Sequence, residues 1–365
     1  MRRASTIIYV IVVLLTLLFG ITMVYSSSYP YAINEGEKFG NDPNYFLKRQ
    51  IIFVTVGLVA MTIAFIIPAN FYKKMPIVFL LGSLFICALT FTSLGVNVNG
   101  AQRWISLGGI TIQPSDFLKL GVALYIPFLL ANDKNKKMLP YIMPLAIGVC
   151  GAIVYLQQDL GTAILIVAVM AIMYFLTYMS MPEFFVYLAA ASGFLYYAIA
   201  GTEYRRGRWQ AFLNPFSDRL DTGWHAIQSI YAVANGGAIG VGLGNSIQKY
   251  GYIYAAYSDY IFSIISEELG MFGGILTIVA LLFIGLVPVH YAKKMEDKYM
   301  RYFLMTFSLF IILQTLIHVG VVVNAIPAKG ITLPLISYGG SSIITYCAFI
   351  GVALNFMVKG KYKEA

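Results

Sequence analysis

The clearest candidate for chemistry in this chain is an acidic residue at the start of an apolar segment. Asp259 follows Ser258 and opens an apolar run that also contains Glu267 and Glu268. A carboxylate at the start of a helix can serve as a general base, and the positive end of the helix dipole favours its charged form. The alternative is a structural helix terminus with Ser258 as the capping residue, and the sequence supports both interpretations about equally.

Glu267 and Glu268 have a different predicted role. At 1.5 Å per residue along a helix they would lie about 12–14 Å deeper than Asp259. Ionisable groups inside a membrane-spanning segment are usually functional or tightly paired. We therefore expect these two glutamates to pair with neighbouring helices or with the backbone.

Three basic residues could bind an anionic substrate beside Asp259. Arg103 offers a guanidinium fork that suits phosphate oxygens. Lys119 follows Asp116 by three residues, so the two can form an ion pair across one helical turn; contact with an anionic substrate is the alternative for Lys119. Lys249 follows a glycine-rich run and is a candidate for a pyrophosphate contact. Cations near Asp259 would hold the pKa of its carboxyl low.

Turn-forming segments accompany these candidates. Asp159 lies in the turn 157–162, where we expect it to cap a helix. The glycine-rich run 235–246 lacks the Gly-Lys-Ser/Thr of a phosphate loop, so we interpret its glycines as permitting close backbone packing. The segment 324–342 is either a plain connection or a re-entrant segment that lines a cavity. Its structural candidates are Pro334, Ser337, Gly339 and Gly340.

Composition indicates an all-α membrane protein. The chain has 365 residues, of which 59% are hydrophobic and only 11% are charged, whereas a soluble domain has about 25% charged residues. We predict a single membrane domain over residues 1–365 with ten transmembrane helices, because apolar runs near 20 residues long can each span a bilayer. The predicted spans are 6–26, 49–68, 75–93, 115–131, 140–156, 160–178, 183–200, 259–288, 302–324 and 339–358.

Basic residues are distributed unevenly between the two sides. With the N-terminus inside, one side collects more than half of the 25 basic residues in short segments: Arg2, Arg3, Lys73, Lys74, Lys134, Lys136, Lys137, Lys293, Lys294, Lys298, Arg301, Lys359, Lys361 and Lys363. The positive-inside rule then predicts that both termini are cytoplasmic and that the long segment 201–258 is extracytoplasmic. The net charge of +9 reflects this topology and contact with anionic membrane lipids, not a nucleic-acid site.

Polar segments gather on the predicted extracytoplasmic side. Because irregular backbone at membrane depth must be buried or line a wet cavity, we expect these segments to converge on one cavity. They are 97–119, 157–162, 224–249, 258–268 and 324–342. The three cysteines and three histidines are scattered, and no metal-ligating cluster is visible in the sequence.

Six ordered motifs resemble the SEDS family (shape, elongation, division and sporulation) of polytopic peptidoglycan polymerases, which includes FtsW, RodA and SpoVE. They are Arg103–Ile105, Gln113–Lys119, Gln158–Ala163, Gln228–Lys249, Ser258–Gly270 and Gly330–Ser342. The similarity spans essentially the whole chain and is closer to the FtsW and SpoVE branch. One departure lies just before Asp259, where Tyr254 and Ala255 replace the family's usual Pro-Glu.

The resemblance implies an enzyme that polymerises lipid II at the outer face of the cytoplasmic membrane. The acceptor hydroxyl would attack the donor's anomeric carbon, and undecaprenyl pyrophosphate would leave. The resemblance makes Asp259 the base and adds Gln228, Ser229 and Ser258 to the candidate substrate contacts. It implies no certain cofactor, although a divalent cation (Mg²⁺ or Mn²⁺) could share the charge of the leaving group.

Two other functions stay open at the level of sequence. A flippase for lipid II would need a similar cavity, and a non-catalytic scaffold would need only a surface for its partner. The implied protein partner is a class B penicillin-binding protein with transpeptidase activity, which the scaffold would recruit. The sequence leaves division, elongation and sporulation as alternative cellular roles.

Overall fold

The computed structural model describes residues 2–98, 101–107, 110–132, 137–201, 203–217 and 223–362, and it is dominated by long apolar helices. Residues 202 and 218–222 of the predicted loop 201–258 lie outside the described residues. The principal helices are α1 (Arg2–Asn34), α2 (Tyr45–Ile66), α4 (Pro76–Leu89), α5 (Pro114–Ala131), α6 (Leu139–Leu156), α7 (Leu160–Thr177), α8 (Met181–Ala200), α11 (Ile261–Lys294), α12 (Lys298–Val322) and α13 (Gly340–Lys359). Proline in the first turn of α4, α5, α6 and α8 suits its fixed backbone angle.

The predicted membrane class is confirmed. Eight of the helices in the described part of the chain are long and apolar enough to cross a bilayer: α1, α2, α5, α6, α7, α11, α12 and α13. The predicted spans 75–93 and 183–200 correspond to α4 and α8, but α4 has only 14 residues. Ten spans therefore remain a prediction.

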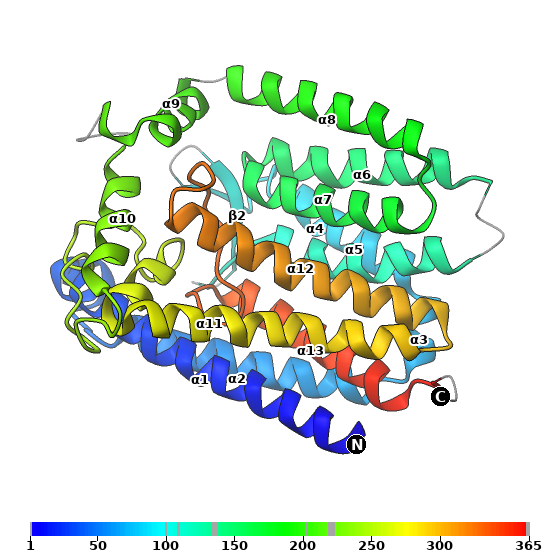
Figure 1. Ribbon diagram of the computed structural model, residues 1–365, viewed down its shortest axis with the longest axis horizontal. Helices are drawn as coiled ribbons and strands as arrows, with labels where there is room; N and C mark the ends of the chain where they lie inside the picture. Colours follow the sequence, from blue (N-terminus) through cyan, green and yellow to red (C-terminus); the bar gives the residue numbers. More distant parts are fainter. Residues whose placement is uncertain are drawn as a thin grey trace.

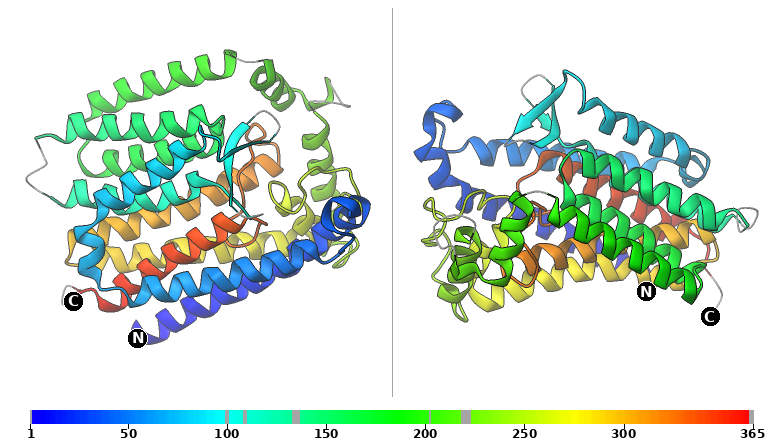
Figure 2. Two further views of the ribbon diagram at one scale, coloured as in Figure 1. Left: turned by 180° about the vertical axis from the view of Figure 1, so that it is seen from behind. Right: turned by 90° about the horizontal axis from the view of Figure 1, so that it is seen from above.

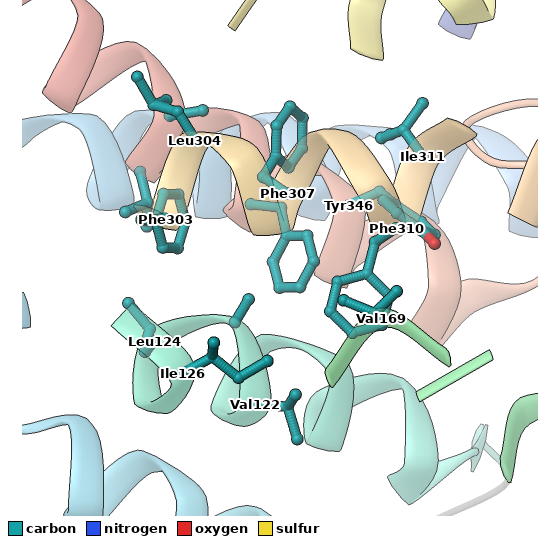
Figure 3. Close-up of a cluster of buried hydrophobic side chains, with 14 of the residues drawn as sticks. Val122, Leu124, Ile126, Val169, Phe303, Leu304, Phe307, Phe310, Ile311 and Tyr346 are labelled. Carbon is teal, nitrogen blue, oxygen red and sulfur yellow. The ribbon is translucent and has the colours of Figure 1, made fainter. Parts of the chain in front are cut away.

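The helices form a bundle with distinct ends (Figure 1). Both chain termini lie at one end, and the segments before and after α10 (Trp224–Gly236) lie at the other (Figure 2). Inside the bundle, Phe303, Phe307 and Phe310 of α12 recur at helical spacing and pack against α5 and α13 (Figure 3). This core fixes the helices that carry the polar loops.

The polar segment before α5 folds as a small sheet, which the sequence did not predict. Strands β1 (Gly95–Val98), β2 (Ala101–Leu107) and β3 (Ile110–Ile112) pair antiparallel in that order. The long loop also has internal structure, with α9 (Glu203–Leu213), the short η3 (Pro215–Ser217) and α10. Two further short elements are η1 (Gly36–Phe39) and α3 (Ala69–Lys74).

The glycine-rich run packs against a break in α11. Gly270 has φ 67° and ψ −168°, so the helix is interrupted there. The backbone of the run replaces helical hydrogen bonds: the Met271 amide donates to the Gly237 carbonyl at 2.9 Å, and the Val241 amide donates to the Glu267 carbonyl at 3.0 Å. A Cβ at Gly240 would lie 2.2 Å from the Glu268 carbonyl oxygen. The predicted close backbone packing of these glycines is confirmed.

Candidate active site

Asp259 lies in a turn before α11 and not in the helix itself. The helix begins at Ile261, so the expectation that Asp259 opens it is wrong by two residues. The Asp259 amide donates to the Ala255 carbonyl at 3.1 Å, which closes the turn. No side chain caps this helix end, and the Ser258 hydroxyl instead faces the Ala255 carbonyl at 3.4 Å. The capping interpretation is therefore wrong.

The segment after α12 holds this turn in place. Ser337 donates its hydroxyl to the Ser258 carbonyl at 2.7 Å and accepts a hydrogen bond from the Leu333 amide at 2.7 Å. The Tyr338 amide donates to the Tyr257 carbonyl at 2.9 Å. Together these bonds fix the backbone on which Asp259 stands.

The Asp259 carboxyl is partly buried beside Arg103. A Cβ at Gly330 would lie 3.0 Å from Asp259 Oδ2 and 3.7 Å from Arg103 Nη1, so both side chains border this glycine. Burial raises the pKa of Asp259 to about 6, although Arg103 and Arg208 act in the opposite direction. The expected low pKa is wrong because desolvation outweighs the nearby cations.

A cavity of about 190 Å³ is lined by Arg103 and Gly330, the two residues beside the Asp259 carboxyl; Asp259 itself is not among the lining residues. Its polar lining includes Arg103 from β2, Arg205 and Arg208 from α9, Lys329 from the loop after α12, and Asp159. Figure 2 shows the strands β1–β3 near the loop that follows α12. Four basic side chains thus meet at one hollow.

Packing fixes the orientation of the two α9 arginines. Arg205 Nη1 donates to the Tyr155 hydroxyl at 2.9 Å, and its guanidinium carbon lies 4.8 Å from the centre of that ring. Arg208 Nη1 donates to the Ala328 carbonyl at 3.2 Å. Because residues three apart share a helix face, both can border the same cavity.

Burial and the neighbouring positive charges both affect the pKa of Lys329 in the cavity wall. Burial lowers the pKa of its ammonium to about 8, and the charges of Arg208 and Arg205 lower it further, against the opposing effect of Asp159. A bound anion would relieve this repulsion, because an opposite charge favours the charged form of each cation.

Asp159 connects the cavity to the bundle interior. One carboxylate oxygen accepts a hydrogen bond from the Thr162 amide at 3.0 Å, at the N-cap of α7, and the other accepts from Gln113 Nε2 at 2.9 Å. The Gln113 amide donates to the Ser341 hydroxyl, which donates to Asp116 Oδ2 at 2.7 Å. This series of hydrogen bonds connects Asp159, in the cavity wall, to the buried Asp116 of α5.

Lys119 does not share the cavity with Asp259. It is 3% exposed, and its ammonium donates to Asp116 Oδ1 at 2.9 Å and to Gln314 Oε1 at 3.1 Å. Asp116 is also buried. The expected substrate contact of Lys119 is corrected to an internal ion pair of α5, because burial of the ammonium demands an adjacent carboxylate.

Lys249 is likewise bound inside the protein. Its ammonium lies 2.8 Å from Glu268 Oε1 and also donates to the Gly244 carbonyl at 2.6 Å. The Ser26 hydroxyl of α1 completes this group by donating to Glu268 at 2.6 Å. Glu267 contacts the Ser246 hydroxyl. The glutamates pair with neighbouring segments as expected, and the predicted pyrophosphate contact of Lys249 is corrected.

The two remaining substrate candidates from α10 are internal to the fold. Ser229 is fully buried, and its hydroxyl contacts the Ser263 hydroxyl and the Val322 carbonyl, each at 2.7 Å. Gln228 is also buried. This geometry replaces their expected substrate contacts.

The segment 324–342 lines the cavity only through its first half. A Cβ at Gly340 would lie 2.7 Å from the Phe53 ring, so this glycine packs against α2. The other structural candidates, Pro334, Ser337 and Gly339, also lie outside the cavity lining. The residues of this segment that form the cavity wall are Ile326, Pro327, Lys329 and Gly330.

The predicted convergence of five polar segments is only partly correct. Segments around β2, the α6–α7 turn and the loop after α12 line the cavity, whereas 224–249 packs against α11 and 258–268 contributes no lining residue. Sequence reasoning missed Arg205, Arg208 and Lys329. The arginine pair at a spacing of three was the available signal, but residues in a long loop contributed little to the topology argument.

Comparison with known proteins places the whole chain among related sequences. Residues 6–362 match the model of the cell cycle protein family of FtsW, RodA and SpoVE. The chain is 35% identical to a probable peptidoglycan glycosyltransferase FtsW of Geobacter metallireducens over 368 residues, which cover 99% of this chain and 96% of that one. It is also 35% identical to the stage V sporulation protein E of Bacillus subtilis over 369 residues, with 99% of each chain covered.

Solved structures share the fold. A chain of a peptidoglycan synthase complex superposes with a TM-score of 0.79 at 23% identity and covers 96% of both chains. The rod shape determining protein RodA of Thermus thermophilus has a TM-score of 0.70 at 21% identity, covering 96% of this chain and 95% of that chain.

Proposed function

The chain belongs to the FtsW, RodA and SpoVE family of cell cycle proteins, and from this membership we propose that it is a peptidoglycan glycosyltransferase whose active site is the cavity beside Asp259. The observation in the structure that supports this site is the Asp259 carboxyl beside Arg103, at the edge of a cavity that Arg205, Arg208 and Lys329 also line. The substrate would be lipid II.

In this proposal Asp259 is the general base. It takes the proton from the acceptor's sugar hydroxyl while that oxygen bonds to the donor's anomeric carbon. The bond from that carbon to the pyrophosphate oxygen breaks, and undecaprenyl pyrophosphate leaves with the electron pair. A pKa of about 6 keeps the carboxyl largely ionised at neutral pH and makes it a stronger base than an ordinary aspartate.

The cations would stabilise the leaving pyrophosphate. Arg103, Arg205 and Arg208 present planar donor forks that match phosphate oxygens, and Lys329 adds a compact charge. Because they are held by the fold before substrate arrives, they need little reorganisation as charge develops. A cavity of about 190 Å³ is smaller than the roughly 300–1,000 Å³ of pockets for drug-sized ligands. It would hold the pyrophosphate and the adjoining sugar atoms, while the lipid chain extends beyond it.

Each step above is assigned to a side chain of the protein. In the described ranges, no three His, Cys, Asp or Glu side chains are grouped to hold a metal ion. A contribution of Mg²⁺ or Mn²⁺ to the charge of the leaving group stays a prediction, which polymerisation assays with and without a chelator would test.

The proposed orientation places both termini in the cytoplasm and the active site outside. The common end of the two termini (Figure 1) and the short basic loops support it. The thiol introduced by Gly207→Cys, in α9, should then react with an impermeant reagent in intact spheroplasts; reaction only after lysis would reverse the orientation.

A class B penicillin-binding protein is the proposed partner. The superposition on a chain of a peptidoglycan synthase complex supports such an assembly. Relatives named FtsW and a stage V sporulation protein leave division and sporulation as the proposed cellular roles.

The deciding experiment supplies labelled lipid II to the purified protein, with and without the transpeptidase. We expect gel-resolved glycan polymer from the wild type and a loss of about 10²–10⁴-fold in Asp259→Asn. Asp42→Asn is the matched control, because it makes the same change at a carboxylate that pairs with Lys48 outside the cavity lining. Translocation of the lipid II headgroup without polymer would identify a flippase, and neither activity would leave a scaffold.

A further inference from the structure

A second cavity lies at the opposite end of the bundle, beside the chain termini. Its volume is about 480 Å³. Three segments meet there: the turn from α2 into α3, the turn between α11 and α12, and the tail after α13. Figure 1 shows α3 near the C-terminus. The site around Asp259 uses none of these segments.

Two lysines near the C-terminus line this cavity: Lys359 is the last residue of α13, and Lys361 follows that helix. The Lys359 ammonium donates to the carbonyls of Phe65 and Ile66 at the end of α2, at 3.2 and 3.3 Å. The Lys361 carbonyl accepts the Glu296 amide at 3.1 Å, so the backbone of the tail is attached to the α11–α12 turn. Both lysine side chains are exposed at the cavity. These hydrogen bonds hold both residues in place beside the cavity.

The lining carries a local excess of positive charge. Lys73 lies 2.5 Å from Asp297 Oδ2, and the other oxygen of Asp297 accepts the Met300 amide at the start of α12. Asp297 is therefore already matched by one lysine. The remaining charged lining residues are Lys359, Lys361 and Glu296, so two cations stand against one carboxylate.

Apolar side chains adjoin the lining residues along the chain. Ile66, Phe71 and Val358 are 66%, 41% and 52% exposed, and they stand next to the α2–α3 turn and to Lys359. On a membrane protein such side chains face lipid. A ligand that fits this neighbourhood has an anionic head and hydrocarbon tails.

We propose that this cavity binds the headgroup of an anionic phospholipid from the leaflet at this end of the bundle. The lipid phosphate accepts hydrogen bonds from Lys359 and Lys361, and the acyl chains lie along Ile66 and Val358. Basic pockets between membrane helices bind such headgroups, and each basic residue near the surface contributes to the attraction. The proposal is independent of the glycosyl transfer.

The test measures binding of fluorescent phosphatidylglycerol to the full chain in micelles, against phosphatidylcholine as the neutral reference. Lys359→Gln/Lys361→Gln should weaken phosphatidylglycerol binding by about fivefold for each lysine. The matched control is Lys293→Gln/Lys294→Gln, which removes the same charge from exposed residues in the last turn of α11, outside the cavity lining. The control should lose much less affinity than Lys359→Gln/Lys361→Gln, because its lysines act only through the general surface charge.

Glu296→Gln supplies a test that does not disturb the lysine contacts. It should strengthen phosphatidylglycerol binding, because it removes a carboxylate from the lining. Three results would overturn the proposal. They are an equal loss of phosphatidylglycerol affinity in the two lysine double variants, binding of phosphatidylcholine as tight as that of phosphatidylglycerol, and no increase in phosphatidylglycerol affinity in Glu296→Gln. Soluble glycerol 1-phosphate should compete weakly; binding as tight as the lipid would show a site for free phosphate compounds instead.

Discussion

Replacing Arg103 by glutamine should shift the pH dependence of polymerisation to higher pH. Asp259 must be ionised to act as the base, so activity falls as pH drops through its pKa of about 6. Arg103 is the largest of the charges that lower this pKa. Its removal therefore makes the carboxyl harder to ionise, and the acid limb of kcat/KM moves upward.

The size of the shift follows from the geometry. The Asp259 Oδ2 and Arg103 Nη1 atoms lie 3.0 and 3.7 Å from the position of a Cβ on Gly330, so they are at most about 7 Å apart. At that separation, Coulomb's law with an effective dielectric constant of about 20 gives roughly 2.4 kcal/mol. Both side chains are partly exposed, so screening by solvent reduces this to about one pH unit. The midpoint should move from about 6 to about 7 in Arg103→Gln.

The assay is kcat/KM for lipid II polymerisation between about pH 5 and 8, which reports the pKa of the free enzyme. Arg103 also contacts the proposed leaving group, so the midpoint and not the absolute rate is the readout. Arg103→Lys keeps the charge and should keep the midpoint, although it loses the bidentate fork. An unmoved midpoint in Arg103→Gln, or an acid limb that survives in Asp259→Asn, would refute the reasoning.

Three further predictions concern stability, each measured by thermal unfolding of the purified chain. Asp259→Asn should stabilise the protein by about 1 kcal/mol near pH 7.5. Burial raises the folded pKa of Asp259 above its unfolded value of about 3.9, so ionisation of the carboxyl disfavours the folded state. The gain should vanish as pH falls below about 4, and a variant less stable than wild type at pH 7.5 would contradict this prediction. Lys249→Met should destabilise the protein by about 3–5 kcal/mol because it leaves the buried Glu268 carboxylate without its ion-pair partner. The double variant Lys249→Met/Glu268→Gln should recover much of this stability. No recovery would argue against the ion pair. Gly240→Ala should cost far more than Gly244→Ala: both glycines have φ 82°, but only the first would place a Cβ against backbone, 2.2 Å from the Glu268 oxygen. Equal costs would show that the positive φ alone matters.

Hydropathy predicted the membrane helices but not the structure between them. Long apolar runs have one stable arrangement in lipid, because every backbone polar group must be satisfied within the segment. The sheet of 95–112 and the helices α9 and α10 depend on contacts with the rest of the chain, and their composition resembles ordinary loops. Asp259 was identifiable because an acid beside an apolar run is rare. Arg205 and Arg208 were not, since a long polar loop contains charges for many reasons, and Lys329 was one of several basic residues in short loops on that side.

The sequence also could not separate paired cations from those that share a cavity. Lys119 and Lys249 look like substrate contacts until the fold brings each against its own carboxylate, three and nineteen residues away along the chain. Sequence distance carries no information about the second pairing, which requires the glycine run to fold back onto α11.

The physical difference between these two kinds of cation is the charge that remains after pairing. Lys119 and Lys249 each meet one buried carboxylate, so an approaching anion would gain little from them and would have to enter a packed interior. At the cavity, four basic side chains share the lining with the carboxylate of Asp159, and Asp259 lies next to Arg103 and Gly330. Burial lowers the pKa of Lys329 most, and the charges of Arg208 and Arg205 lower it further. In the proposed mechanism this positive charge stabilises the leaving pyrophosphate, while burial raises the pKa of Asp259 and makes it a stronger base. The same desolvation that makes the cations attractive to an anion thus raises the pKa of the carboxyl, and the two halves of the proposed catalysis have one structural cause.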